Sequence, residues 1–267
     1  MEVGPLLPDE IWYMIAMLSP EVFALVRLIN KTVYYYTQER IGNYKEKFSV
    51  EVTEEVDGEL VICSRLPNGW LHGLYQRWYS NGNLYIERNY KDGLEEGINQ
   101  EWYENGQLNV LSNYVSGELE GLEEIWSKDG QLCARCTYVS GRPDGFSQKW
   151  HENGRPSFQC NHVSGKLEGL AQAWHANGQL RLELNYTHGN EDGLQQQWYS
   201  NGRPRVKYTV EVGKPMLYQG LYQEWHENGQ LSKECSYVDG KKDGLHREWH
   251  ENGQLRSERT YVAGVEQ

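Results

Sequence analysis

Residues 220–231, GLYQEWHENGQL, contain the pattern that decides the fold of this 267-residue chain. Its glycine and tryptophan positions recur along most of the sequence every 24 residues, as from Trp78 to Trp102. Only one interval differs, because Gly193 and Gly220 lie 27 residues apart. Self-similarity at such a period predicts a repeat architecture. The repeated tryptophans, which we expect to be structural, are Trp78, Trp102, Trp126, Trp150, Trp174, Trp198, Trp225 and Trp249.

Each unit has the pattern of a β-hairpin. Asn-Gly between two alternating runs is a strong hairpin signal, because both turn residues must accept a positive φ. Strand alternation places Leu74 and Trp78 on one face of the first strand, and Ile86 and Tyr90 on one face of the second. A lone hairpin is marginally stable, so we expect the units to stack and bury their Trp and Leu side chains. The expected fold is mostly β, an elongated antiparallel β-hairpin repeat array with a small α-helical head at the N-terminus.

A glutamine recurs on the predicted tryptophan face, two residues before each tryptophan. Amide side chains at equivalent positions can hydrogen-bond to one another, so we expect a ladder from unit to unit. The members are Gln76, Gln100, Gln148, Gln172, Gln196 and Gln223, with Glu124 and Arg247 at the same position in two units.

The repeat divides the chain into three parts. Residues 73–267 hold eight 24-residue units. Residues 49–72 hold a degenerate capping hairpin, because Gly58 and Leu60 lie one period before Gly82 and Leu84. Residues 1–48 show no trace of the repeat and carry apolar residues at helical spacing, which predicts a helical head.

The recurring Gly, Trp and Asn-Gly of residues 73–264 resemble the MORN-type repeats, in the variant with an aromatic-x-x-Asn-Gly core. The resemblance implies an elongated hairpin array that scaffolds or binds proteins, or attaches to membrane lipid. A formal charge of −12, with no run of Lys or Arg, disfavours nucleic acid and anionic lipid. We therefore expect protein partners and no nucleic acid, and a membrane-associated scaffold is the weaker alternative.

The head resembles an F-box. The residues that carry the resemblance are Leu7, Pro8, Ile11, Ile15 and Ile29. The F-box family implies docking onto the Skp-type adaptor of a cullin ubiquitin ligase. A head of this type joined to such repeats is similar to proteins of large DNA viruses of the marseillevirus kind. The other interpretation is that the helices only cap the β array.

No arrangement of residues indicates catalysis, and we expect no enzyme activity, no cofactor and no metal. His246, Glu248 and His250 alternate along one strand and contain the ligand types that zinc prefers. We expect all three on the solvent-exposed face of the strand. However, histidine follows tryptophan at a repeat position that elsewhere holds tyrosine, so we expect surface aromatic residues at His151, His175, His226 and His250. Cys136 and Cys160 occupy equivalent positions about 10 Å apart, too far for a disulfide, and are expected to be small core residues.

A face of exposed aromatic and acidic side chains is the predicted partner surface. The alternative is that these rings only stabilise cross-strand neighbours. The aromatic residues are Tyr75, Tyr79, Tyr103, Tyr199, Tyr222, His226 and His250.

The five cysteines are odd in number, and the N-terminal residues do not resemble a signal peptide. We expect a cytoplasmic protein, in a host cell or virion if the viral similarity holds. The expected function is a non-enzymatic protein-binding scaffold or adaptor that recruits a ubiquitin ligase through its head. The alternative is a structural scaffold or virion component with no link to ubiquitin.

Overall fold

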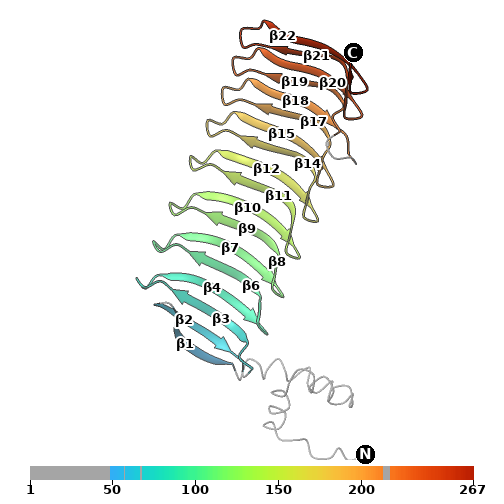
Figure 1. The fold of residues 1–267 in the computed structure, drawn as a ribbon. Helices are drawn as coiled ribbons and strands as arrows, with labels where there is room; N and C mark the ends of the chain where they lie inside the picture. Colours follow the sequence, from blue (N-terminus) through green and yellow to red (C-terminus); the bar gives the residue numbers. More distant parts are fainter. Residues whose placement is uncertain (1–48, 57, 67, 213–216) are drawn as a thin grey trace, which may run out of the picture. The chain divides into compact units, whose positions relative to one another are not determined.

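The computed structural model describes residues 49–267, except 57, 67 and 213–216. The described residues form β-strands and turns, in two compact units that divide between Glu118 and Leu119. Figure 1 shows successive hairpins in chain order within each unit. The predicted array of antiparallel hairpins is therefore confirmed. The predicted helical head, with its F-box-like residues, lies outside the described residues.

Three hairpins make up the first unit, β1 with β2, β3 with β4 and β6 with β7. Shorter ladders join β2 to β3 and β4 to β6. The strands are β1 (Val50–Val56), β2 (Glu59–Arg65), β3 (Leu71–Trp78), β4 (Leu84–Lys91), β5 (Leu94–Glu95), β6 (Gly97–Trp102) and β7 (Leu108–Val115). Strand β8 (Glu118–Leu119) contains the last residue of this unit and the first of the next.

The second unit continues the same pattern with β9/β10, β11/β12, β14/β15, β17/β18, β19/β20 and β21/β22. The two-residue strands β13, β16 and β23 follow the turns between hairpins. The strands are β9 (Gly121–Trp126), β10 (Leu132–Val139), β11 (Arg142–Trp150), β12 (Pro156–Val163), β13 (Lys166–Leu167), β14 (Gly169–Trp174), β15 (Leu180–Thr187), β16 (Asn190–Glu191), β17 (Gly193–Trp198), β18 (Pro204–Val210), β19 (Gly220–Trp225), β20 (Leu231–Val238), β21 (Lys241–Trp249), β22 (Leu255–Val262) and β23 (Val265–Glu266).

In each unit the buried side chains lie on one face of the sheet, which we call the packed face. Leu66, which follows the last residue of β2, is the only other buried residue described. Most of the side chains that become buried on the packed face are small, and the strands that carry them are curved (Figure 1). In the first unit they are Val61, Cys63, Ile86, Asn99 and Ser112. In the second they are Ser147, Cys160, Ala171, Ala173, Gln195, Val210, Cys235 and His246.

The expectation that stacking would bury the leucine after each repeat glycine is wrong. Leu74 is 43% exposed, and it lies on the opposite face of the sheet, which we call the open face. The register explains the difference: Gln76 pairs with Glu87 and Arg77 pairs with Ile86, so Leu74 and Ile86 point to opposite sides. All eight repeat tryptophans end a strand and are half-buried.

The Asn-Gly turn also differs from the expectation. Only Gly82 has a positive φ, 85°, while the Tyr79 carbonyl accepts a hydrogen bond from the Gly82 amide at 2.9 Å. Asn81 supports this turn differently, by accepting the Asn83 amide on its side-chain oxygen at 2.9 Å. The turn with two positive φ values is at the other end of the hairpin, at Asp92 (55°) and Gly93 (84°).

Every hairpin of the eight repeats carries a β-bulge next to its tryptophan. In the first, Trp78 pairs with Leu84 and Arg77 pairs with Ile86, so Tyr85 is left without a ladder partner. A bulge bends its strand and redirects the side chain of the extra residue. In the last four hairpins, the extra residues are Arg181, Arg205, Ser232 and Arg256.

The degenerate hairpin predicted before the repeats is present as β1 and β2, but it is one residue out of phase. Ile86 pairs with Glu101 in the repeat. The residues 24 positions earlier are Ile62 and Arg77, so the repeat predicts that these two pair. In the structure Arg77 pairs with Val61 instead. The shift places Val61 on the packed face, because a one-residue change of register exchanges the two faces of a strand.

Candidate functional site

Side chains link neighbouring hairpins at their tryptophan ends. The Tyr79 hydroxyl donates to the Trp102 carbonyl at 2.9 Å. In the second unit, Tyr199 makes the same bond to the Trp225 carbonyl at 2.8 Å, and Nε2 of His226 bonds the Trp249 carbonyl at 2.9 Å. The residue after the tryptophan therefore has a structural role in these three hairpins.

The turn asparagines form a second set of links. The Asn153 amide donates to the Ala176 carbonyl at 2.7 Å, and Asn177 donates to Ser200 at 2.6 Å. Asn228 repeats the contact to Glu251 at 2.6 Å. These bonds explain why asparagine recurs where only the following glycine needs a positive φ.

The predicted partner-binding aromatic residues do not form one surface. Three of them, Tyr79, Tyr199 and His226, are half-buried links between hairpins. Tyr103 is half-buried at the same repeat position, whereas His250, in the last hairpin, is exposed. Tyr75 and Tyr222 lie on the packed face, because they pair with Arg88 and Cys235 respectively.

Tyr222 belongs to a cluster of tyrosines beside the three-residue insertion of the sequence. The Tyr218 ring lies 5.3 Å from those of Tyr208 and Tyr222 and 5.1 Å from that of Tyr237. Burial, followed by the hydrogen bond that Tyr222 donates to Glu224, raises the pKa of the Tyr222 phenol. The cluster packs the site where the period is interrupted.

The open face carries two columns of exposed apolar side chains in the second unit. The first column is the residue after each repeat glycine, and its members are 40–49% exposed: Leu122, Phe146, Leu170, Leu194, Leu221 and Leu245. The second column ends four of the longer strands, and its members are 48–54% exposed: Val139, Val163, Val238 and Val262. It is interrupted at β15 and β18, which end in Thr187 and in the buried Val210. In the first unit the corresponding residues are Leu74, Ile98 and Val115.

The repeat glutamines lie beside these columns but do not form the expected ladder. Gln76 donates to Glu87 at 2.6 Å and Gln223 donates to Glu234 at 2.8 Å, in both cases across one hairpin. An amide-to-amide bond between hairpins is seen from Gln159 to Gln172, at 2.8 Å. In each case the glutamate is the residue that pairs directly with the glutamine on the neighbouring strand, so the two side chains lie side by side.

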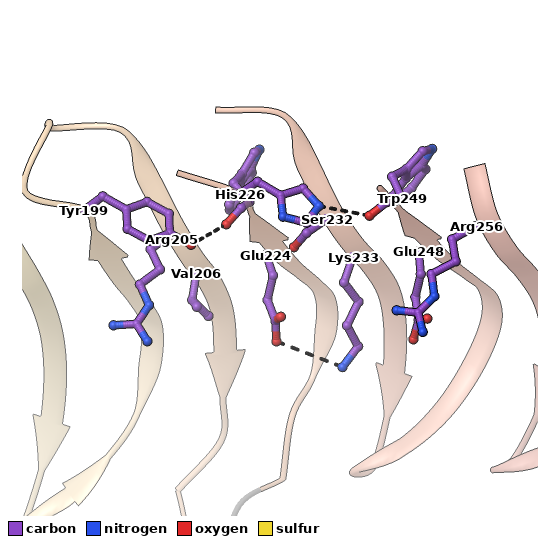
Figure 2. Close-up of a pocket in the computed structure, with 11 residues that line it drawn as sticks. Tyr199, Arg205, Val206, Glu224, His226, Ser232, Lys233, Glu248, Trp249 and Arg256 are labelled. Atoms are coloured by element: carbon purple, nitrogen blue, oxygen red, sulfur yellow. Dashed lines mark hydrogen bonds and ion pairs between the residues drawn. The ribbon is translucent and has the colours of Figure 1, made fainter. Parts of the chain in front are cut away.

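A groove of about 600 Å³ lies at the tryptophan ends of the last three hairpins. Figure 2 shows Arg205 and Arg256 at its two ends, with His226 and Lys233 between them. Two carboxylates also line it, those of Glu224 and Glu248. Sequence reasoning missed this site. Arginine recurs as the second residue of the second strand of a hairpin, at Arg181, Arg205 and Arg256, and this recurrence could have indicated it.

The cluster with the most nucleophilic groups lies on the packed face of β10, β11 and β12. The Ser147 hydroxyl lies 2.7 Å from the Cys136 sulfur and 3.2 Å from Nδ1 of His162. Burial raises the pKa of the Cys160 thiol to about 11 and lowers the pKa of His162. The conditions for a thiolate–imidazolium pair are therefore poor, because both shifts favour the neutral forms. The predicted core role of Cys136 and Cys160 fits their half-buried and buried positions.

His246 is 8% exposed on the packed face, so the expectation that it lies on the solvent-exposed face of its strand is wrong. Its Nε2 lies 3.5 Å from Glu248, whereas His250 is exposed at the following turn. No group of three or more His, Cys, Asp or Glu side chains in the described part of the chain is arranged to hold a metal ion. Within the same residues, no helix has the length and apolar character needed to cross a membrane.

Five segments match the family model described as MORN repeat variant: residues 71–92, 95–116, 167–188, 218–239 and 242–263. The predicted resemblance to these repeats is thus confirmed for five segments. The matches do not include residues 1–48, so they give no support to the F-box-like head or to the viral similarity. No curated protein matches the chain.

Solved structures with local similarity include TarM from S. aureus in complex with fondaparinux, alpha-GlcNAc-glycerol and UDP. It is 15% identical, with a TM-score of 0.25, over 52% of this chain and 24% of that one. A second TarM structure is 16% identical, with a TM-score of 0.24, over 52% and 23%. The chain therefore spans about a quarter of the length of either protein.

Proposed function

We propose that this protein is a non-catalytic scaffold that binds a protein partner along the open face of its hairpin repeats. The observation that carries the proposal is the pair of apolar columns in the second unit, from Leu122 to Leu245 and from Val139 to Val262. Contiguous exposed apolar surface commonly marks an interaction site. MORN-type repeats are consistent with such a role.

The repeat spacing favours a partner that is itself extended. Equivalent residues in successive hairpins are two strands apart, or roughly 10 Å. A partner must therefore contact several hairpins to bury an area typical of a specific interface, about 800 Å² on each side. Each leucine contributes only part of that area, so binding should depend on the number of intact positions.

The test is affinity purification of the full chain, with the variant Leu170→Glu/Leu194→Glu/Leu221→Glu alongside. We expect the triple variant to lose the bound protein while keeping the far-ultraviolet circular dichroism of the wild type. Leu255→Glu is the matched control, because Leu255 is 52% exposed but lies outside both columns. Equal binding by the triple variant and the wild type would refute the proposal.

A second candidate is an adaptor that also recruits a ubiquitin ligase through residues 1–48. Its support is the F-box-like pattern that includes Ile11 and Ile15. The full chain should then retain a purified Skp-type adaptor, and Ile11→Asp or Ile15→Asp should abolish this binding. If the wild-type chain does not retain the adaptor, the ubiquitin-ligase proposal is wrong and the scaffold proposal stands alone.

A further inference from the structure

The bulge residues of the C-terminal hairpins place cationic side chains beside aromatic rings. Arg205 is the extra residue between Pro204, which pairs with Trp198, and Val206, which pairs with Gln197. Arg256 occupies the same position two hairpins later, and Ser232 occupies it in the hairpin between them. The sequence contains no run of basic residues, so this column exists only because the repeat aligns the bulges.

The two guanidinium groups are available for a ligand. Cζ of Arg205 lies 5.9 Å from the centre of the Tyr199 ring, and Arg205 and Arg256 are both exposed. Neither forms an ion pair with a carboxylate of the described residues.

The carboxylates in the groove already have partners within the chain. Glu224 lies 4.0 Å from Nζ of Lys233 and accepts a hydrogen bond from the Tyr222 hydroxyl. Glu248 lies 3.5 Å from His246 and accepts a hydrogen bond from the Ser257 hydroxyl at 3.4 Å. The pKa of His246 is lowered by burial, so its ring does not offset the charge of Glu248. The lining therefore holds three basic side chains, Arg205, Lys233 and Arg256, against two carboxylates, on a chain whose net charge is −12.

The spacing of the two arginines defines the length of a ligand. Four strand intervals separate them, which correspond to roughly 19 Å. An extended peptide advances about 3.3 Å per residue, so two side chains six positions apart are separated by about 20 Å. Between the arginines, the His226 ring lines the groove (Figure 2). Trp225, the preceding residue, also lines it.

We propose that this groove binds an extended acidic peptide, with two carboxylates six residues apart on Arg205 and Arg256 and an aromatic or apolar residue between them. Arginine pairs well with carboxylates because its planar group can donate two parallel hydrogen bonds. The groove and the open-face columns are different surfaces, so this proposal can fail while the scaffold proposal holds.

The probe is a dye-labelled nonapeptide with glutamate at positions 2 and 8, tyrosine at position 4, which lies on the same face of an extended chain, and serine or glycine elsewhere. Fluorescence anisotropy with the full chain in 0.1 M NaCl should show saturable binding, because that ionic strength screens charges beyond about 10 Å but not contact pairs. Arg205→Gln and Arg256→Gln should each weaken binding about two- to fivefold, the range for exposed ion pairs. The double variant should weaken it by about the product of the two.

Lys207→Gln is the matched control, because this substitution removes the same charge from the same strand. Lys207 itself lies on the open face, where it pairs with Gln223. It should leave the affinity unchanged. Ser232→Arg adds a third arginine to the column, and it should strengthen binding of a peptide that carries a third glutamate at position 6.

Several results would overturn the proposal. They are absence of saturable binding, equal binding of a peptide with glutamine at positions 2 and 8, and equal weakening by Lys207→Gln. Tighter binding of a labelled ten-residue oligothymidylate would show that the groove selects nucleic acid instead. Circular dichroism of each variant separates loss of binding from loss of fold.

Discussion

The Tyr199 hydroxyl donates a hydrogen bond to the backbone carbonyl of Trp225 at 2.8 Å, and the two residues belong to successive hairpins. The ladder between these hairpins is short, since β18 and β19 pair only at Val206 and Lys207. A side-chain bond therefore adds to the few backbone bonds that hold one hairpin to the next.

Replacing Tyr199 by phenylalanine should destabilise the protein. The ring is kept, but the Trp225 carbonyl loses its donor, which typically costs about 0.5–1.5 kcal/mol. Urea unfolding of the full chain measures the change. His250→Phe is the control, because His250 occupies the same repeat position but is exposed, and it should have little effect. Equal losses in the two variants would show that the contact between hairpins is not the cause.

Ser164→Asn should stabilise the fold. Ser164 has a φ of 51°, in the left-handed region, and is followed by Gly165 with a φ of 81°. Asparagine tolerates this conformation better than serine, so we expect a gain of about 0.5 kcal/mol. The midpoint of thermal unfolding is the measurement. Ser157→Asn, in strand β12, should give no gain, and a gain there would contradict the explanation from the turn.

The Cys160 thiol should resist alkylation in the native protein. Burial raises its pKa to about 11, so at pH 8 only about 0.1% is thiolate. Mass spectrometry after iodoacetamide treatment, with and without urea, checks this site by site. Rapid native modification of Cys160 would contradict its burial.

The same shift makes stability depend on alkaline pH. The folded pKa is above that of an unfolded thiol, near 8.5, so the folded state holds the proton more tightly. The free energy of unfolding should therefore fall as the pH rises from about 8.5 towards 11. Cys160→Ser should show a smaller fall over this range, and an unchanged pH profile would count against the assignment.

Acidification should destabilise the fold through His246. Burial, followed by repulsion from Lys242, whose Nζ lies 3.1 Å from Nδ1, lowers the pKa of His246 below its usual value. The unfolded state then binds a proton more readily, so the free energy of unfolding should fall as the pH drops through about 6.5. His246→Gln should reduce this slope, whereas His250→Gln, at an exposed site, should retain it. Equal slopes in both variants would refute this role.

The repeat and the strand ends were predictable because they rest on local rules. The eight tryptophans mark the end of one strand of each hairpin, as their spacing predicted. The prediction that Gly82 lies in a turn with a positive φ was correct, but the prediction of a positive φ at Asn81 was wrong. Its side chain bonds the Asn83 amide and, one hairpin away, the Glu104 carbonyl. The second contact depends on a residue that the local sequence does not contain.

The faces of the sheet were harder to predict. Alternation predicts which residues of one strand share a face with Leu74, and which residues of the next strand share a face with Ile86. Whether those two faces are the same side of the sheet depends on the register between the strands. A difference of one residue, as at Val61, reverses the assignment. The bulge at each tryptophan adds a further shift that no single hairpin sequence reveals.

The sequence by itself determined a row of antiparallel hairpins, because a period of 24 residues repeats the same turns and strand ends, and each hairpin folds by local contacts. The tertiary structure alone decided which side chains became neighbours. Arg205 and Arg256 are 51 residues apart in the chain, yet they line one groove because bulges in aligned hairpins turn them the same way. Pairing between strands, which joins distant residues, is the physical reason for the difference.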